Sequence, residues 1–262
     1  MRRGSVVVVL LALFSVPGLA VAGVVVQFEQ PKGRSTYTAE GKKLRMETVG
    51  EHAEIMIFDG DAQKLFRINQ GDHTYSELTQ ADAKGVSAQI DEMLSKLPPE
   101  RRAMMEERMK QAGTKTAAPR PVTYEPTGAR QTVAGYACQG YRVVRDGKAS
   151  EQGCFIPWGT NAVQKADLGA LVEFENFMQR FMSAAWGAGP RRSGSRITEE
   201  LERAPGFPAM MERVTEGGKV ENAERLVSLK HTGVPAETFT VPPGYTKVTM
   251  PGFGAGRPRD RK

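Results

Sequence analysis

Few residues in this chain have the types and spacing that covalent catalysis or metal binding requires. The three histidines, His52, His73 and His231, are far apart and match no metal-ligand spacing. No serine lies in a Gly-x-Ser-x-Gly turn, and no glycine-rich stretch has the Gly-x-x-x-x-Gly-Lys pattern that holds phosphates. The stretch 59–61, Asp-Gly-Asp, lacks the later acidic positions of a calcium loop and predicts a plain turn. We therefore expect a protein that is not an enzyme and that uses neither a metal ion nor a cofactor.

The two cysteines, Cys138 and Cys154, flank an Asp-Gly pair at 146–147 that favours a tight hairpin turn. A two-residue turn there places Cys138 opposite Phe155, one position away from Cys154, and a three-residue loop or a β-bulge would correct the register. We predict a disulfide between Cys138 and Cys154, the alternative being two free, buried thiols. The spacing is not Cys-x-x-Cys, so we expect a structural bridge and no redox role.

The first 22 residues have the three parts of a secretory signal peptide. A basic start at 1–3 precedes an apolar run at 6–14, and Ala-Val-Ala at 20–22 fits the cleavage pattern. We predict cleavage after Ala22, the alternative being an uncleaved anchor. The mature protein is then expected in the periplasm or outside the cell, where disulfides persist. No second apolar run of membrane-spanning length follows, so we expect no stable membrane anchor.

The net charge of +6 lies largely in segments that we do not expect to be folded. One is the Gly/Ser/Pro-rich stretch GAGPRRSGSR at 187–196, and another is the tail 251–262, which we predict to be disordered. Nucleic-acid binding favours a folded basic patch with interleaved aromatic residues, so we expect no nucleic-acid partner. The basic tail is expected to aid solubility, the alternative being contact with anionic lipid headgroups.

The pattern of apolar residues predicts two β-meanders separated by a helical insertion near 81–112. The two prolines at 98–99 are expected to break this insertion into two helices. A third helix near 166–186 is so widely apolar that it must be buried or cover a cavity. The late stretch 238–248 predicts a closing strand. We interpret 23–250 as a single β-rich domain.

Apolar residues on the predicted helices are the only candidates for a ligand site. Of the twelve methionines, eight lie at 93–109, 178–182 and 210–211, and methionine adapts to irregular or variable surfaces. These side chains either fill an ordinary core or line a cavity for an apolar ligand. Our candidates for the lining are Leu94, Met105, Phe174, Phe181 and Trp186.

Five stretches carry a resemblance to a known family: KKLRMET, IMIFDGDAQKLFRINQGDHTYSEL, LPPERRAMMEERM, GYACQGYRVVRDGKASEQGCFIPW and FTVPPGYTKV. In these the chain resembles the bacterial envelope family called domain of unknown function 4412. In that family an Asp-Gly turn precedes a Tyr-x-Glu strand, a Leu-Pro-Pro-Glu helical segment often follows, and Gly-Tyr-x-Cys comes later. The resemblance covers nearly the whole mature chain, and the biochemical role of the family is unknown.

More distantly, the architecture is similar to periplasmic lipoprotein carriers of the LolA and LolB type. That resemblance implies an α+β fold, with a curved antiparallel β-sheet or incomplete β-barrel whose concave face is covered by helices. It implies no particular ligand residues, because the apolar lining of such carriers has no fixed motif.

Two functional hypotheses follow from these observations. The first is a non-enzymatic periplasmic carrier or binder of a lipid or of a lipid-modified, hydrophobic protein. The second is an envelope protein-interaction module with a filled core, in which Met104, Met105 and Met109 contact a protein partner. A continuous apolar cavity on the order of several hundred Å³ between sheet and helices would favour the carrier, and a densely packed interior would favour the module.

Overall fold

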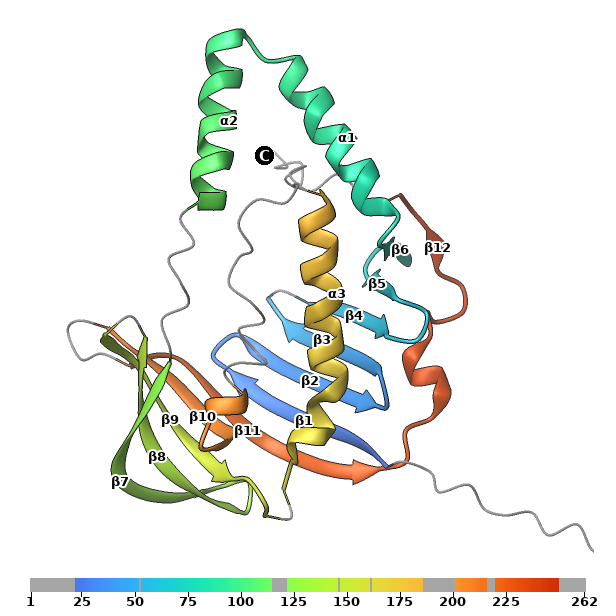
Figure 1. Ribbon diagram of the computed structural model, residues 1–262. Coiled ribbons are helices and arrows are strands. Elements are labelled where there is room, and N and C mark those ends of the chain that lie inside the picture. Colours follow the sequence, from blue (N-terminus) through green and yellow to red (C-terminus); the bar gives the residue numbers. More distant parts are fainter. Residues whose placement is uncertain are drawn as a thin grey trace, which may run out of the picture.

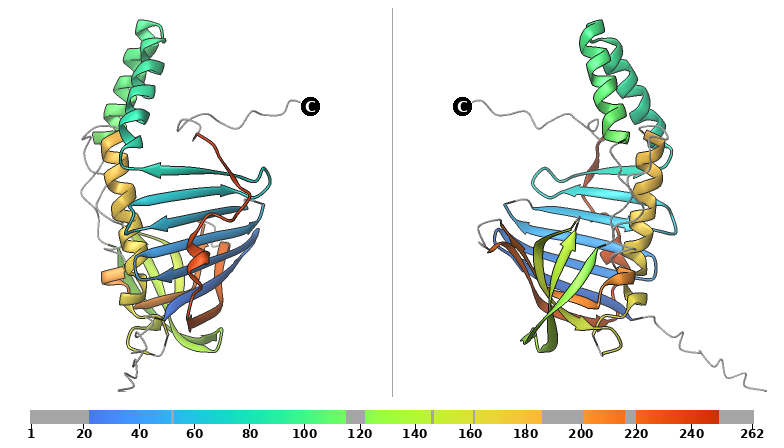
Figure 2. Two further views of the ribbon diagram at one scale, coloured as in Figure 1. Left: turned by 90° about the vertical axis from the view of Figure 1, so that its right-hand side faces the viewer. Right: turned by 60° about the vertical axis from the view of Figure 1, so that its left-hand side comes forward.

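The computed structural model describes residues 22–51, 53–114, 122–145, 147–160, 162–185, 201–215 and 220–249. The predicted signal peptide, apart from Ala22, and the predicted basic tail lie outside these residues, as does Trp186. The described part of the chain forms one large curved sheet with helices on one side and a C-terminal segment on the other (Figures 1 and 2).

The N-terminal part of the chain is an antiparallel meander, as the alternation of apolar and polar residues predicts. Short turns join the strands, such as the one at Gly41, whose φ of 57° lies in the left-handed region that glycine adopts without strain. The strands are β1 (Gly23–Gln30), β2 (Gly33–Glu40), β3 (Lys43–Gly50), β4 (Glu54–Asp59), β5 (Lys64–Asn69) and β6 (Thr74–Thr79).

A second group of antiparallel strands completes the main sheet: β7 (Thr123–Val133), β8 (Tyr136–Arg145), β9 (Lys148–Pro157), β10 (Gly206–Val214) and β11 (Val220–Thr232). The last of these pairs with β1, where Val26 lies opposite Leu229. This ladder joins both groups in the order β6-β5-β4-β3-β2-β1-β11-β10-β9-β8-β7. The curved, open and mostly antiparallel sheet confirms the predicted α+β class of an incomplete barrel.

Three long helices in the described part of the chain accompany the sheet. The helix α3 (Gly169–Ala185) follows a short 3₁₀ turn, η1 (Lys165–Leu168), and lies across the concave face (Figure 1). The helices α1 (Asp82–Ser95) and α2 (Pro99–Thr114) form a hairpin that extends beyond the β6 end of the sheet (Figures 1 and 2). Pro99 begins α2 because a first-turn residue needs no N–H donor. Among the described residues, no helix is both long and apolar enough to span a membrane.

The C-terminal segment crosses the convex face of the sheet, opposite α3 (Figure 2). It contains a 3₁₀ turn, η2 (Ala236–Phe239), and a short strand, β12 (Thr246–Lys247), which pairs parallel to β6. The closing strand predicted over 238–248 is therefore wrong in extent, because only two of its residues pair. Pro242 and Pro243 explain the difference, since proline has no N–H to donate to a ladder.

An ion pair and a small apolar core add to this backbone pairing and hold the C-terminal segment to the sheet. The carboxylate of Glu77 on β6 lies 2.6 Å from Lys247 Nζ and 2.9 Å from Lys64 Nζ. Phe239 packs in a small convex-face core with three isoleucines of β4 and β5, namely Ile55, Ile57 and Ile68.

Cys138 and Cys154 form the predicted disulfide, with their Cα atoms 5.5 Å apart. The connection between β8 and β9 is the expected two residues long, since Arg145 pairs with Lys148. A β-bulge does occur, but its extra residue is on β9, whereas only an extra residue on β8 would bring Cys138 opposite Cys154. Gly140 therefore lies opposite Cys154, and the disulfide crosses the ladder diagonally.

Candidate functional site on the concave face

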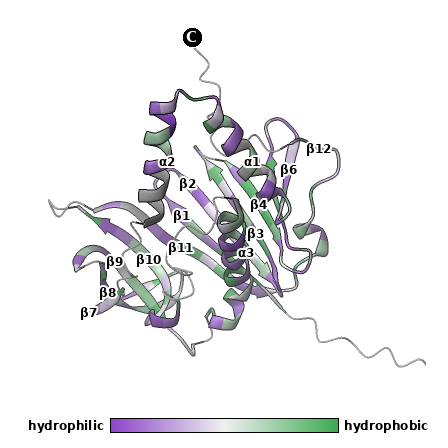
Figure 3. Ribbon diagram, turned by 45° about the horizontal axis from the view of Figure 1, so that its top comes forward, coloured by the Kyte–Doolittle hydropathy of each residue, from purple (hydrophilic) through white to green (hydrophobic). Residues whose placement is uncertain are grey.

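The part of the concave face beneath α3 is a tightly filled core, which we call the covered sector. The ring of Phe58 on β4 lies 5.6 Å from that of Phe174 and 5.3 Å from that of Phe177, measured between centroids. Phe177 and Phe181 have no exposed surface. Figure 3 shows the hydrophobic colouring along β4 behind α3. The remaining buried members of the covered sector are Leu44, Leu65, Leu78, Ala83 and Ala170.

Hydrogen bonds position α3 along its length. Near its middle, the backbone carbonyl of Phe177 accepts a 2.9 Å bond from the amide of Gln80, which follows β6. One turn later, Arg180 donates a 2.6 Å bond to the Gln63 side chain, which precedes β5. Before its first residue, Asp167 of the η1 turn lies 3.1 Å from His231 of β11, measured from Oδ2 to Nε2. The helix and the η1 turn before it are thus tied to β11 and to residues next to β5 and β6.

Methionines surround the covered sector. Four half-buried methionines pack against its core, two from the strands and two from α3: Met46, Met56, Met178 and Met182. Their unbranched, polarizable side chains fill irregular space and can repack at low cost. The contact between α3 and the sheet is therefore rigid at its phenylalanine centre and adaptable at its margin.

Beside the covered sector, the concave face presents half-buried aromatic rings on β1 and β2. The ring centroid of Phe28 lies 6.1 Å from that of Tyr37, and the two rings stand edge to face with an interplanar angle of 81°. The ring centroid of Phe207 on β10 also lies 6.1 Å from that of Phe28. We call Phe28, Tyr37 and Phe207, together with Gln30 and Glu224, the Phe28 patch. Phe28, Tyr37, Gln30 and Glu224 are each partly exposed, whereas Phe207 is buried. The patch combines apolar rings with polar atoms that a ligand can reach.

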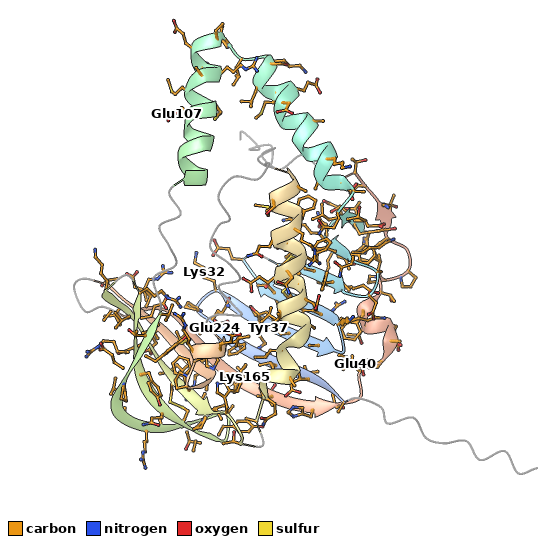
Figure 4. All side chains as sticks on the ribbon, in the orientation of Figure 1. Lys32, Tyr37, Glu40, Glu107, Lys165 and Glu224 are labelled. Atoms are coloured by element: carbon orange, nitrogen blue, oxygen red, sulfur yellow. A yellow bond between two sulfur atoms is a disulfide. The ribbon has the colours of Figure 1, made fainter. Side chains whose placement is uncertain are left out.

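The polar groups of the patch form a connected set. The amide of Gln30 donates a 2.9 Å hydrogen bond to the carboxylate of Glu224. Burial raises the pKa of the Tyr37 hydroxyl above its usual value, the charge of Glu224 raises it further, and a hydrogen bond with Ser35 acts in the opposite direction. Figure 4 labels Tyr37 and Glu224 between α3 and the β7–β11 strands. At neutral pH the phenol of Tyr37 is therefore protonated, and the Glu224 side chain lies close enough to act on it.

The predicted lining residues are found in different parts of the molecule. Phe174 and Phe181 both belong to the covered sector, so the structure brings these two together. Leu94 is buried near the end of α1. Met105 is 39% exposed on α2 and is not part of the core that contains the phenylalanines of α3. Trp186 lies outside the described residues.

The hairpin of α1 and α2 carries apolar side chains on its surface. Met93 is 53% exposed and Met104 is 57% exposed, and Met105 lies nearby on α2. Figure 1 shows the hairpin directed away from the sheet. These methionines are accessible to another molecule.

The sequence analysis missed the Phe28 patch. Phe28 alternates with polar residues along β1, a signal for a side chain on the buried face, but its neighbours come from β2, β10 and β11. Only the paired sheet places them together. Among the described residues, no group of three or more histidines, cysteines or carboxylates is arranged to hold a metal ion.

Comparisons with known proteins give distant matches in structure alone. No protein-family model and no curated protein matches the chain, so membership in the family of domain of unknown function 4412 stays a prediction. A solved structure of an uncharacterized conserved protein from Thermus thermophilus is similar at 9% identity and a TM-score of 0.41, over 88% of this chain and 91% of that one.

Structures of MucB are also similar. MucB in the Pseudomonas aeruginosa MucA/MucB complex is 12% identical with a TM-score of 0.35, over 83% of this chain and 54% of that one. MucB in complex with MucA(peri) is 11% identical with a TM-score of 0.37, over 88% and 58%. The chain thus spans little more than half the length of MucB. At these identities, function has to be argued from the residues of the chain itself.

Proposed function

We propose that the protein is a non-enzymatic binding protein of the cell envelope, which carries a lipid or a lipid-modified protein on the concave face of its sheet. The observation that supports this most is the Phe28 patch, where half-buried aromatic rings lie beside a fully buried core. Such partly covered apolar surface, with a few polar groups at fixed positions, is typical of ligand sites.

In this proposal α3 forms one wall of the site. Burying an acyl chain against the rings contributes about 25 cal/mol per Å² of apolar area. The methionines at the margin of α3, such as Met178 and Met182, would repack around ligands of different shape. Release would follow a movement of α3 at this adaptable margin.

One observation and one prediction support an envelope location. The disulfide between Cys138 and Cys154 is of the kind that persists in oxidising compartments. The predicted signal peptide would direct the chain to such a compartment.

The direct test is binding of N-phenylnaphthylamine, an uncharged fluorophore that brightens in apolar sites. The variant Phe28→Asp should bind it more than about tenfold more weakly, because a charged group would be desolvated in the site. The matched control is Val49→Asp, since Val49 is 56% exposed on β3. Both variants must keep the wild-type circular dichroism. Equal affinities of the two variants for the fluorophore would contradict a ligand site at the Phe28 patch.

A second candidate function is a protein-interaction module, favoured by the exposed methionines of α1 and α2. In that case Met93, Met104 and Met105 contact an envelope partner, and the filled covered sector serves only stability. Photo-crosslinking from position 104 in living cells tests this reading, and a single discrete adduct would support it.

A further inference from the structure

We infer that the Phe28 patch selects ligands with a positively charged head, an ammonium group attached to an apolar chain, and that Glu224 and Tyr37 recognise this group. The inference rests on the proposed function and adds the chemical class of the ligand. In this inference Glu224 is the acidic side chain that binds the ammonium group.

Glu224 has the acceptor capacity that such a group needs. Its carboxylate accepts one hydrogen bond through Oε1, from Gln30. An ionised carboxylate has about four lone-pair sites on its two oxygens, so acceptor positions remain. Among the described residues, Glu224 has no ion-pair partner. A half-buried, uncompensated carboxylate attracts a cation more strongly than a fully solvated one does.

Two cations near the patch, Arg225 and Lys32, are directed elsewhere. Arg225 follows Glu224 directly, and successive side chains of a strand point to opposite faces. Lys32, at the turn between β1 and β2, lies 2.8 Å from Glu51 in an ion pair. With these two cations directed elsewhere, the charge of Glu224 favours ammonium heads and disfavours carboxylate or phosphate heads.

The aromatic rings add a second attraction for the same group. Phe28 and Tyr37 stand edge to face at 81°, so their ring faces point in two directions around the patch. An ammonium group within about 6 Å of a ring centroid is attracted to the negative face of the ring. The Tyr37 hydroxyl, which stays protonated at neutral pH, supplies a further acceptor oxygen. The apolar chain would continue over Phe28 and Phe207.

The test uses two amphiphiles with the same alkyl chain, dodecylammonium and dodecanoate, each below its micelle concentration at pH 7. Displacement of N-phenylnaphthylamine from the mature protein should give dodecylammonium at least about a tenfold advantage. Glu224→Gln, which keeps the shape of the side chain, should bring the two affinities close together, because it weakens dodecylammonium binding and removes the repulsion of dodecanoate. Tyr37→Phe should reduce the preference to a smaller degree.

The matched control is Glu29→Gln, because Glu29 is exposed on β1 and points to the opposite face from Phe28. It removes the same charge and should leave the preference unchanged. Ethanolamine, an amine without an apolar chain, should displace nothing at the same concentrations, and displacement by it would overturn the claim of an amphipathic ligand.

The possible failures are distinguishable. If both amphiphiles bind equally to the wild type, or if Glu224→Gln keeps the preference, the headgroup assignment is wrong while the proposed binding function stands. If neither amphiphile nor the fluorophore binds, the proposed function and the inference both fail.

Discussion

Gln30 and Glu224 share a hydrogen bond of 2.9 Å although 194 positions separate them in the chain. They lie one position beyond Glu29 and Arg225, the last paired residues of the β1–β11 ladder. This ladder joins the two strand groups, so the Phe28 patch exists only when the sheet is complete. Ligand binding should therefore be lost together with the global fold and should not survive in either half alone.

The covered sector should dominate the stability of α3 on the sheet. Phe181→Ala removes a side chain with no exposed surface and should lower the free energy of unfolding by about 3–5 kcal/mol. Urea denaturation followed by circular dichroism measures this. The control is Ser183→Ala, exposed on the same helix, which should change the stability by under about 0.5 kcal/mol. Similar losses in both variants would contradict the packing described for α3.

The disulfide should be a structural bridge. Replacing Cys138 and Cys154 together by alanine should lower the free energy of unfolding by about 3 kcal/mol, because the closed loop no longer restricts the unfolded chain. Binding of N-phenylnaphthylamine at low temperature should be retained by the folded variant. A loss of binding without a loss of stability would assign the cysteines a direct role that we do not expect.

Acid should loosen the C-terminal segment. Hydrogen bonds from Lys247 and Lys64 hold the pKa of Glu77 below its usual value. A carboxyl group whose pKa is lower in the folded state contributes stability above its unfolded pKa of about 4.3 and loses it as pH falls through the folded pKa. The lysines are well exposed, so solvent screens both pairs and their contribution to stability is small.

Glu77→Gln tests this dependence. The stability difference between wild type and variant should be constant above about pH 5 and should shrink as the pH falls below about 4. Hydrogen exchange of the Val248 amide, which donates a 2.8 Å bond to the Tyr75 carbonyl, reports on the same attachment. A difference that grows toward low pH would have the wrong sign for this account.

Much of the fold follows from the sequence for identifiable reasons. Alternation in β1 to β6 and the turn residues between them fix the first meander, and the wide apolar surface of 166–186 predicts a buried helix where α3 lies. The closing strand fails because two prolines remove donors that the pattern of apolar residues does not take into account. The disulfide pairing is predictable, but the side of the ladder that carries the bulge is not, since no residue near 150 signals it.

The candidate site is harder to predict. Phe174 and Phe181 are candidates because they lie on an apolar helix, and the structure places them in one core. Met105 is a candidate on the same grounds, but no local pattern indicates that α2 extends away from the sheet. Glu224 and Tyr37 come together only through strand order, which the sequence of one chain does not specify.

The surface of the helical hairpin allows a test of the second candidate function. The double variant Met104→Asp and Met105→Asp should leave the unfolding midpoint unchanged, because both side chains are exposed. It should also leave N-phenylnaphthylamine binding unchanged if the concave face is the ligand site. Loss of a specific crosslinked partner in the double variant, with Val49→Asp unaffected, would instead favour the interaction module.

The most direct test of the central claim is native mass spectrometry of the mature protein purified from its own envelope, before and after solvent extraction. The account predicts an added mass of lipid size that extraction removes and that an amphiphile with an ammonium head restores. If the mass is that of the protein alone and added phospholipid or acylated peptide does not change it, the carrier function is contradicted and the interaction module is favoured.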